Sequence, residues 1–230
     1  MSIPKIIHQI WIGPNPEPTI WTNTIKKNYI KEHPSWDYKL WNNDNINELF
    51  INFPIIKIVY DLTTKWSGKS DILRYLILYK YGGLYIDADS VWVNNKSFDI
   101  LLECKESIFA AREPHCNHIT GGVIGSCKNH KVFLDILNEI EHYVKNNNSI
   151  KKKKYIKICT IKGYSKLLGP ILFNKHAINY DIKIYPSEYF YPISWHNIKD
   201  INYHLKNKLP EDSFMFQYGY TTNNFKNIIG

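Results

Sequence analysis

Short apolar runs alternate with amphipathic stretches along most of this chain. The first run, residues 5–12 (KIIHQIWI), is rich in β-branched residues and is closed by Gly13-Pro14, which predicts a buried strand. Strands that alternate with helices are typical of a layered α/β fold. We predict strands over residues 5–12, 38–41, 84–86, 107–111 and 123–124, and helical segments over residues 21–31, 46–50, 54–62, 71–81, 131–144 and 164–168.

The most regular pattern spans residues 67–93. Ser70 is a suitable N-cap, and it would place Asp71 in the first turn of a helix, where the helix dipole favours an anion. Apolar residues at helical spacing give this helix a broad buried face. Gly82-Gly83 predicts its end, as glycine does at helix C-termini, and residues 84–86 then form a short buried strand.

Two aspartates, Asp87 and Asp89, follow this strand with Ala88 between them. Side chains alternate faces along a strand, so we expect the two carboxylates to point the same way and Ala88 to point into the core. Two carboxylates on one face repel each other unless a cation lies between them. Hard oxygen ligands select Mg²⁺ or Mn²⁺. The spacing predicts a metal site for a diphosphate, although such a pair is by itself also typical of a surface turn.

The residues around this pair resemble the sugar-binding core of glycosyltransferase family 32. That family is related to the initiating α-1,6-mannosyltransferase and to the glucosylating domains of clostridial toxins. Its pattern is S-D-x-x-R-y, an apolar helix and then G-G-x-Y-x-D-x-D, and residues 70–75 and 82–89 match every fixed position. Residues 4–13, 33–42 and 169–170 resemble further family elements less specifically.

The resemblance implies a glycosyltransferase-A-type (GT-A) α/β fold, in which a central mixed sheet is flanked by helices, as in other nucleotide-diphospho-sugar transferases. The length of 230 residues fits one domain. We divide this single glycosyltransferase domain, residues 1–230, into a donor-binding part, about residues 1–130, and an acceptor-side part, about residues 131–230.

The resemblance also implies roles for individual residues. Asp89 is expected to coordinate the divalent metal, Mn²⁺ or Mg²⁺, directly, and Asp87 to contact the same ion and the ribose. Asp71 and Arg74 lie three apart, on one helix face, and are expected to hold the donor sugar and its phosphates; the alternative is a local ion pair. Asp71, Arg74 and Asp89 form the expected catalytic set. The other expected donor-binding residues are Ile10 and Trp11, which could instead be core residues, Gly83, which could be part of a helix cap, and Gln217.

One position departs from the family pattern. Many related enzymes carry a His in a short C-terminal segment as a further metal or diphosphate ligand, whereas residues 214–220 of this chain read FMFQYGY. Gln217 or Tyr218 occupies the expected position. Either the metal is held less tightly, or Gln217 is a neutral ligand, or His196 or His204 replaces the missing imidazole.

The composition suggests that the protein binds an anion, and the motifs indicate that this anion is a nucleoside diphosphate. The net charge is +8, and all but two of the 29 basic residues are Lys. Lys, Asn and Ile share adenine- and thymine-rich codons, so a skewed genome explains much of this charge. The alternative is selection for anionic partners. With two Arg, the chain is a poor reader of nucleic-acid sequence, and we expect no nucleic-acid partner. The 15% aromatic content suits stacking on sugar rings.

Localisation signals are absent from the sequence. It has no run of 18 apolar residues and no signal-peptide core at its start, and its four Cys form no disulfide framework. We therefore expect a protein of a reducing, cytoplasmic compartment, or of a host cytoplasm if the source is viral, with no integral membrane segment. The oligomeric state is left open.

The predicted function is metal-dependent transfer of a hexose or N-acetylhexosamine from a nucleoside diphosphate sugar to a glycan or protein acceptor. A UDP-sugar is favoured over a GDP-sugar, and retention of anomeric configuration is implied by the resemblance alone. One alternative is a non-catalytic module that binds sugar nucleotides. The other is a DxD phosphohydrolase, in which the first Asp is a nucleophile. That motif normally lies near the N-terminus, whereas 86 residues precede Asp87 here.

Overall fold

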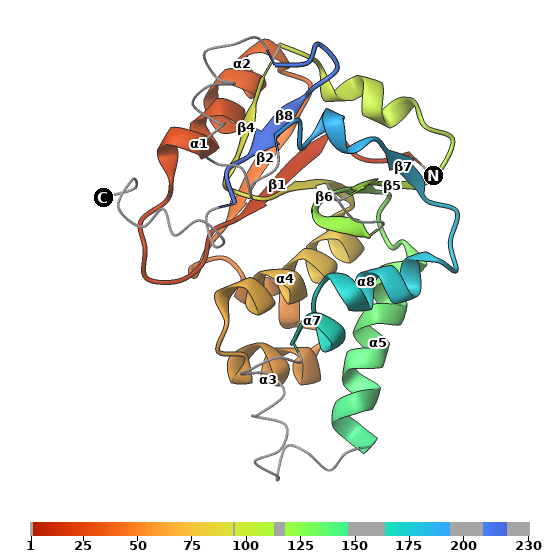
Figure 1. Cartoon of the computed structure of the whole chain (residues 1–230). Helices are drawn as coiled ribbons and strands as arrows, with labels where there is room; N and C mark the ends of the chain where they lie inside the picture. Colours follow the sequence, from red (N-terminus) through yellow and green to blue (C-terminus); the bar gives the residue numbers. More distant parts are fainter. Residues whose placement is uncertain (1, 94, 113–117, 147–163, 194–208, 220–230) are drawn as a thin grey trace.

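The computed structural model describes residues 2–93, 95–112, 118–146, 164–193 and 209–219. A six-stranded mixed sheet with the order β2-β1-β3-β6-β5-β7 runs through the centre of the molecule (Figure 1). β1 is parallel to β2 and β3, β5 is parallel to β7, and β6 is antiparallel to β3 and β5. Its strands are β1 (Ile6–Ile10), β2 (Asp37–Trp41), β3 (Gly83–Ile86), β5 (Ile108–Arg112), β6 (Ile119–Ser126) and β7 (Lys183–Tyr185).

A second, two-stranded sheet joins distant parts of the chain. β4 (Ser90–Trp92), which directly follows the paired aspartates, is antiparallel to β8 (Met215–Gln217). This pairing is not evident from either short segment alone, and it brings residue 217 next to residue 89.

Helices cover both faces of the central sheet. α3, α4, α5, α7 and α8 lie below it in Figure 1, and α1 and α2 lie above it beside β4 and β8. The helices are α1 (Thr19–Asn23), which continues through a π-helical stretch (Thr24–Tyr29) into α2 (Ile30–Glu32), then α3 (Pro54–Leu62), α4 (Trp66–Tyr81), α5 (Lys131–Asn146), α7 (Tyr164–Leu167) and α8 (Pro170–Ala177). Short 3-10 turns cover Asn47–Phe50, Phe98–Glu103 and Ser187–Tyr189.

The sequence of strand β3 carries no charged residue because both faces of the strand are buried. Leu84 and Ile86 pack into the core above the sheet, and Tyr85 packs into the core below it. Because helices cover both faces, all four residues of β3 are buried. The predicted layered α/β architecture with a mixed sheet is therefore confirmed.

The start of α4 differs from the prediction. The helix begins at Trp66, with Lys65 before it, so Ser70 lies inside the helix and is not its N-cap. Asp71 is consequently outside the first turn, and its position owes nothing to the helix dipole. The predicted end is correct: Gly82, with φ of +66°, terminates α4.

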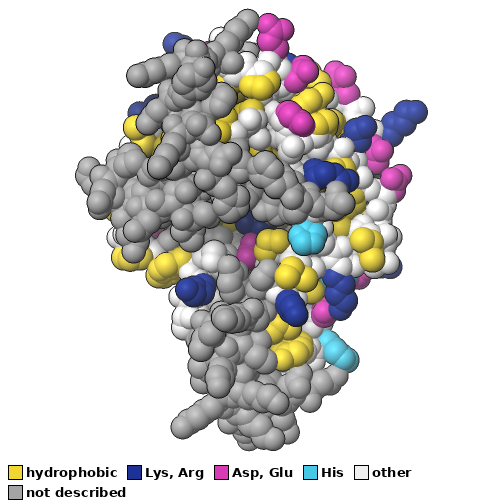
Figure 2. Space-filling view, viewed as in Figure 1, with side chains coloured by type: hydrophobic (Ala, Val, Ile, Leu, Met, Phe, Trp, Pro, Cys, Tyr) yellow, Lys and Arg dark blue, Asp and Glu magenta, His cyan; other side chains and the backbone are white. Residues whose placement is uncertain are grey.

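On the face drawn in Figure 2, the lysine and arginine side chains of the described residues are scattered and do not gather into one basic patch. This distribution agrees with a compositional origin for much of the positive charge. None of the helices in the described ranges is both long and apolar enough to span a bilayer. Residues 145–154 (KNNNSIKKKK) are of low complexity, and all but the first two of them lie outside the described residues.

Candidate active site

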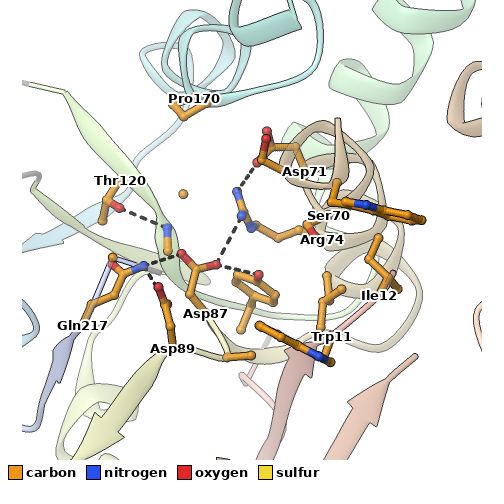
Figure 3. Close-up of a pocket in the computed structure, with 18 of the residues that line it drawn as sticks. Trp11, Ile12, Ser70, Asp71, Arg74, Asp87, Asp89, Thr120, Pro170 and Gln217 are labelled. Atoms are coloured by element: carbon orange, nitrogen blue, oxygen red, sulfur yellow. Dashed lines mark hydrogen bonds and ion pairs between the residues drawn. The ribbon is translucent and has the colours of Figure 1, made fainter. Parts of the chain in front are cut away.

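A cavity of about 460 Å³ lies at the carboxyl ends of β1 and β3, beside α4 and the first residue of α8 (Figure 3). Open α/β sheets commonly bind ligands at this edge. The cavity is lined by Ile10, Trp11, Ile12, Pro14, Asn15, Trp66, Ser67, Ser70, Asp71, Arg74, Tyr85, Asp87, Ala88, Asp89, Thr120, Gly121, Gly122, Pro170, Gln217 and Gly219.

Asp87 is the first residue and Asp89 the third residue of a tight turn that follows β3. The Ser90 N–H donates to the Asp87 carbonyl at 3.1 Å, which closes this turn. Both carboxylates then face the same group, the side-chain amide of Gln217, at 2.9 and 3.0 Å from its Nε2. The predicted common orientation is confirmed, but strand alternation is the wrong reason for it, and Ala88 lines the cavity as well as being buried.

Arg74 is held between two carboxylates on the opposite wall. Its Nη1 donates to Asp71 Oδ1 at 2.8 Å and its Nη2 to Asp87 Oδ1 at 3.4 Å. The guanidinium also lies 4.6 Å from the centre of the Tyr85 ring. Arg74 therefore makes the local ion pair with Asp71 that was the alternative to a donor-binding role, and it also links α4 to the carboxylate pair. Its Nε is buried and has no hydrogen-bond partner in the described part of the chain.

Burial is the largest cause of the shifted pKa values of Asp71 and Tyr85 in this cluster. Burial raises the pKa of Asp71 to about 6, and the Asp87 charge adds to the rise while Arg74 opposes it. Burial likewise raises the pKa of Tyr85 well above its usual value, so its hydroxyl remains a donor to Asp87 Oδ1, 2.7 Å away. Burial disfavours the charge of Arg74, but Tyr85, Asp71 and Asp87 together raise its pKa well above the usual value.

The charges that line the cavity do not balance. Among the described residues that line it, the charged side chains are three carboxylates, Asp71, Asp87 and Asp89, and one guanidinium, Arg74. With all four ionised, the cavity carries two excess negative charges. Such an excess favours a divalent cation.

Two glycines of β6 form the wall that Arg74 approaches. The backbone N–H of Asp87 donates to the Gly122 carbonyl at 2.9 Å, and a Cβ on Gly122 would lie 2.8 Å from Asp87 Oδ2. A Cβ on Gly121 would overlap Arg74 Nη1. Sequence reasoning missed these residues, although a Gly-Gly pair inside an apolar strand is a signal of close approach.

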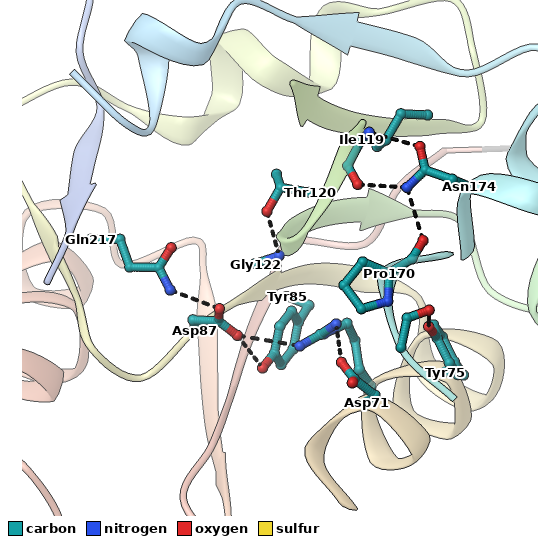
Figure 4. A network of polar contacts seen from close by, with 12 residues as sticks. Asp71, Tyr75, Tyr85, Asp87, Ile119, Thr120, Gly122, Pro170, Asn174 and Gln217 are labelled. Atoms are coloured by element: carbon teal, nitrogen blue, oxygen red, sulfur yellow. Dashed lines mark hydrogen bonds and ion pairs between the residues drawn. The ribbon is translucent and has the colours of Figure 1, made fainter. Parts of the chain in front are cut away.

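A side-chain clamp holds the far wall of the cavity (Figure 4). Asn174 of α8 accepts from the Ile119 N–H at 2.8 Å and donates to the Ile119 and Pro170 carbonyls, each at 2.9 Å. The Tyr75 hydroxyl of α4 donates to the Gly169 carbonyl at 3.2 Å. These bonds fix the start of α8, and with it Pro170, against β6.

Most of the expected site residues meet in this cavity. Ile10 and Trp11 line it together with the four charged residues and Gln217. Gly83 does not, because it begins β3 at the end of the strand away from Asp87. Its φ of +92° and the Ile6 carbonyl, 2.5 Å from where a Cβ would lie, explain the glycine structurally. His196 and His204 lie outside the described residues.

Comparison with known proteins agrees with this geometry. The model of the "glycosyltransferase sugar-binding region containing DXD motif" matches residues 19–108, which include Asp71, Arg74, Asp87 and Asp89. This match covers 90 of the 230 residues, the part of the chain that carries the DXD motif. The resemblance inferred from the sequence is confirmed.

Similarity of this chain to curated proteins extends beyond the residues that the family model matches. Inositol phosphoceramide mannosyltransferase 3 of Schizosaccharomyces pombe is 32% identical over 146 residues, which are 63% of this chain and 39% of the relative. The uncharacterized glycosyltransferase L373 of Acanthamoeba polyphaga mimivirus is 29% identical over 204 residues, 87% of this chain and 78% of the relative. The chain thus matches about two fifths of the yeast enzyme's length.

The fold also agrees with solved structures. The PaToxG glycosyltransferase superposes with a TM-score of 0.56 at 22% identity, over 77% of this chain and 70% of the other. The GT-A fold expected for this chain is therefore confirmed.

Proposed function

We propose that this glycosyltransferase moves a hexose from a nucleoside diphosphate sugar to an acceptor hydroxyl, with Mn²⁺ or Mg²⁺ held by Asp87 and Asp89. The observation that supports this most is the excess of two negative charges in the cavity. A nucleoside diphosphate is itself an anion, so the cavity alone would repel it. A divalent cation removes that repulsion.

The residues fit such an ion and such a donor. Two carboxylates that face one neutral amide provide hard oxygen ligands, which Mg²⁺ and Mn²⁺ prefer. A volume of about 460 Å³ lies within the usual range for small-molecule sites. Ile10 and Trp11 offer an apolar surface for a nucleobase at the other end of the cavity.

The protein's own side chains would position the donor. When bound, the cation neutralises the charge that grows on the leaving diphosphate. Asp71 uses one carboxylate oxygen for Arg74 and lines the cavity, so its other oxygen can accept from a sugar hydroxyl. Arg74 is fixed between Asp71 and Asp87 and keeps its positive charge at every physiological pH. It therefore holds both carboxylates in place, and it opposes the rise in the pKa of Asp71.

The transferred sugar is the finer part of the proposal. Several relatives are named mannosyltransferases, which supports mannose. The sequence itself favoured a UDP-sugar, so GDP-mannose and the common UDP-hexoses all belong in the test. Candidate acceptors are glycans, proteins and, from the name of the fission yeast relative, inositol phosphoceramide.

Release of nucleoside diphosphate from this donor panel tests the proposal. We expect the wild-type protein to release nucleoside diphosphate from one donor in the presence of Mn²⁺ or Mg²⁺ and to release none in EDTA. The Asp89→Ala variant should release none in either condition. Full activity of Asp89→Ala or in EDTA would reject the metal site. Tight donor binding without turnover on any acceptor would favour the non-catalytic module, and phosphate release from a simple phosphomonoester would favour the phosphohydrolase.

A further inference from the structure

The side chain of Gln217 bridges the two carboxylates of the cavity. Its Nε2 lies 2.9 Å from Asp87 Oδ2 and 3.0 Å from Asp89 Oδ1. An ionised carboxylate only accepts hydrogen bonds, so the amide nitrogen, and not the amide oxygen, must face both groups. The two amide hydrogens therefore occupy the place between the carboxylates that a cation would take.

The backbone at Gln217 is fixed, whereas its amide can turn. Gln217 stands opposite Ser90 in the β4–β8 pair, and the N–H of Tyr218 donates to the Asp89 carbonyl at 2.9 Å. Strand pairing thus keeps the side chain beside the carboxylates in every state of the amide. The last torsion of a glutamine joins an sp³ to an sp² carbon and is broad and roughly two-fold, so a half turn of the amide costs little.

We propose that Gln217 is a switch in the metal site, which replaces two N–H donors by one oxygen ligand when a divalent cation binds. This inference rests on the proposed function. A cation between Asp87 and Asp89 would lie against the positive amide hydrogens, and the turned amide presents Oε1 to it instead. In the absence of the ion, the amide hydrogens reduce the repulsion between the two carboxylates.

The switch has a consequence for ion selectivity. With the amide turned, all three protein ligands are oxygen atoms, a set that suits Mg²⁺ and Mn²⁺. An imidazole at position 217 would instead favour Zn²⁺ and other transition metals. The incoming ion must also displace two hydrogen bonds to charged acceptors, which lowers its apparent affinity.

Glutamine labelling makes the switch directly visible. Gln9 and Gln217 are the only glutamines in the sequence, so side-chain ¹⁵N-glutamine gives two amide signals in the full-length protein. Gln9 is the internal reference, because its Nε2 donates to the backbone carbonyl of Asp87, at 3.2 Å, and not to a carboxylate. We expect MgCl₂ without donor to shift the Gln217 signal and to speed its exchange with water by about tenfold, because hydrogen bonds to charged groups are lost.

Calorimetric titration of the same samples with MgCl₂ and MnCl₂ separates two kinds of failure. Absence of binding of either ion to the wild-type protein overturns the proposed metal site and the switch with it. Binding that leaves the Gln217 signal unchanged overturns the switch alone.

A variant adds a second readout. We expect Gln217→His to raise the affinity for Zn²⁺ relative to Mg²⁺ by about tenfold, the lower end of what altered coordination shells produce. An unchanged ratio would contradict the ligand role. Gln217→His combined with Asp89→Asn should lose this gain, because the altered site then lacks a carboxylate ligand.

Discussion

Two buried polar clusters lie beside the same strands, β1 and β3, and they are built in opposite ways. In the first, His8 Nδ1 accepts from Trp41 Nε1 at 3.2 Å and His8 Nε2 lies 2.9 Å from the Gly82 carbonyl. Because an indole N–H only donates, His8 carries its proton on Nε2 and is neutral. Burial lowers the pKa of His8 to about 4, which keeps it so. The second cluster is the charged cavity around Arg74.

This difference indicates that the His8 cluster is structural and that the Arg74 cluster is a binding site. Both ring nitrogens of His8 are paired and its neutral ring buries no net charge, which is what a core histidine requires. Within the described parts of the chain, the Arg74 cluster has excess negative charge, a raised pKa at Asp71 and a buried Arg74 Nε without a hydrogen-bond partner. An unpaired buried donor costs about 1–3 kcal/mol. Proteins retain such an unfavourable group at sites where a bound ligand supplies the missing partner.

Removal of one carboxylate should have the largest effect on activity and should show that the charged cluster is not structural. We expect Asp89→Asn to lower kcat/KM by about 10²–10³-fold, the usual cost of losing one electrostatic group at a reacting centre. In EDTA the same variant should be at least as stable as the wild type, because it relieves repulsion with Asp87. Asp212→Asn, at an exposed surface position, is the matched control and should change neither quantity. A large loss of stability in Asp89→Asn would mean that this carboxylate is structural.

The two clusters should respond to pH with opposite signs in EDTA. Between pH 6.5 and 4, His8 takes up a proton in the unfolded chain but not in the folded one, so acidification lowers the free energy of unfolding, by up to about 3 kcal/mol. Asp71, whose pKa is raised to about 6, is protonated in the folded chain first, so its contribution to stability is lost as the pH rises.

Variants separate these two contributions. Urea unfolding from pH 4 to 7 should show a steeper loss on acidification in Asp71→Asn than in the wild type, and a shallower or reversed one in His8→Gln. Identical slopes in all three proteins would contradict the assignment of His8 as a neutral core residue.

The sequence predicted the charged half of the site better than its walls. Asp71, Arg74, Asp87 and Asp89 lie within 19 consecutive residues, and a motif of this kind can be read locally. Gly121 and Gly122 became site residues only because β6 pairs antiparallel with β3 and brings Gly122 to the Asp87 backbone. No local pattern shows such a pairing.

The remaining errors also have local causes. Ser70 looked like an N-cap because the residues before it, Lys65 to Lys69, carry no strong helix signal, yet Trp66 starts the helix by packing against Gly13. Gly83 was assigned to the donor because the family motif contains it, whereas its neighbours are Ile6 and His8. Strands β1, β2, β3, β5 and β6 were predictable, because their apolar runs match the two faces of the sheet. The short strands β4, β7 and β8 and helix α8 were not among the predicted elements.

A pair of glycine variants in one strand should sharpen the contrast between site and core. A Cβ at Gly121 would overlap Arg74, and one at Gly125 would overlap the Phe109 ring. Overpacking costs about 1–3 kcal/mol. We expect Gly121→Ala to lower kcat/KM by about tenfold with a small change in Tm, since a side-chain end can shift, and Gly125→Ala to lower Tm with a small change in kcat/KM. The reverse pattern would place Arg74 outside the reaction.

The smallest effect is expected at the cavity rim. The Trp66 ring packs on Gly13, and the residue remains 48% exposed. We expect Trp66→Ala to raise KM for the donor a few-fold, by loss of apolar contact, while kcat and the unfolding midpoint stay unchanged. A fall in kcat as large as that of Gly121→Ala would show that the rim takes part in positioning the reacting groups.

The central claim is that the cavity binds an anionic diphosphate only through a divalent cation. Equilibrium binding of GDP and UDP, with Mn²⁺ and with EDTA, tests it most directly. We predict that Mn²⁺ tightens binding of the preferred nucleotide by at least about 100-fold, or about 2.7 kcal/mol, and that Asp87→Asn/Asp89→Asn removes this gain. Equal affinity in Mn²⁺ and EDTA, or an undiminished Mn²⁺ effect in the double variant, would contradict the account.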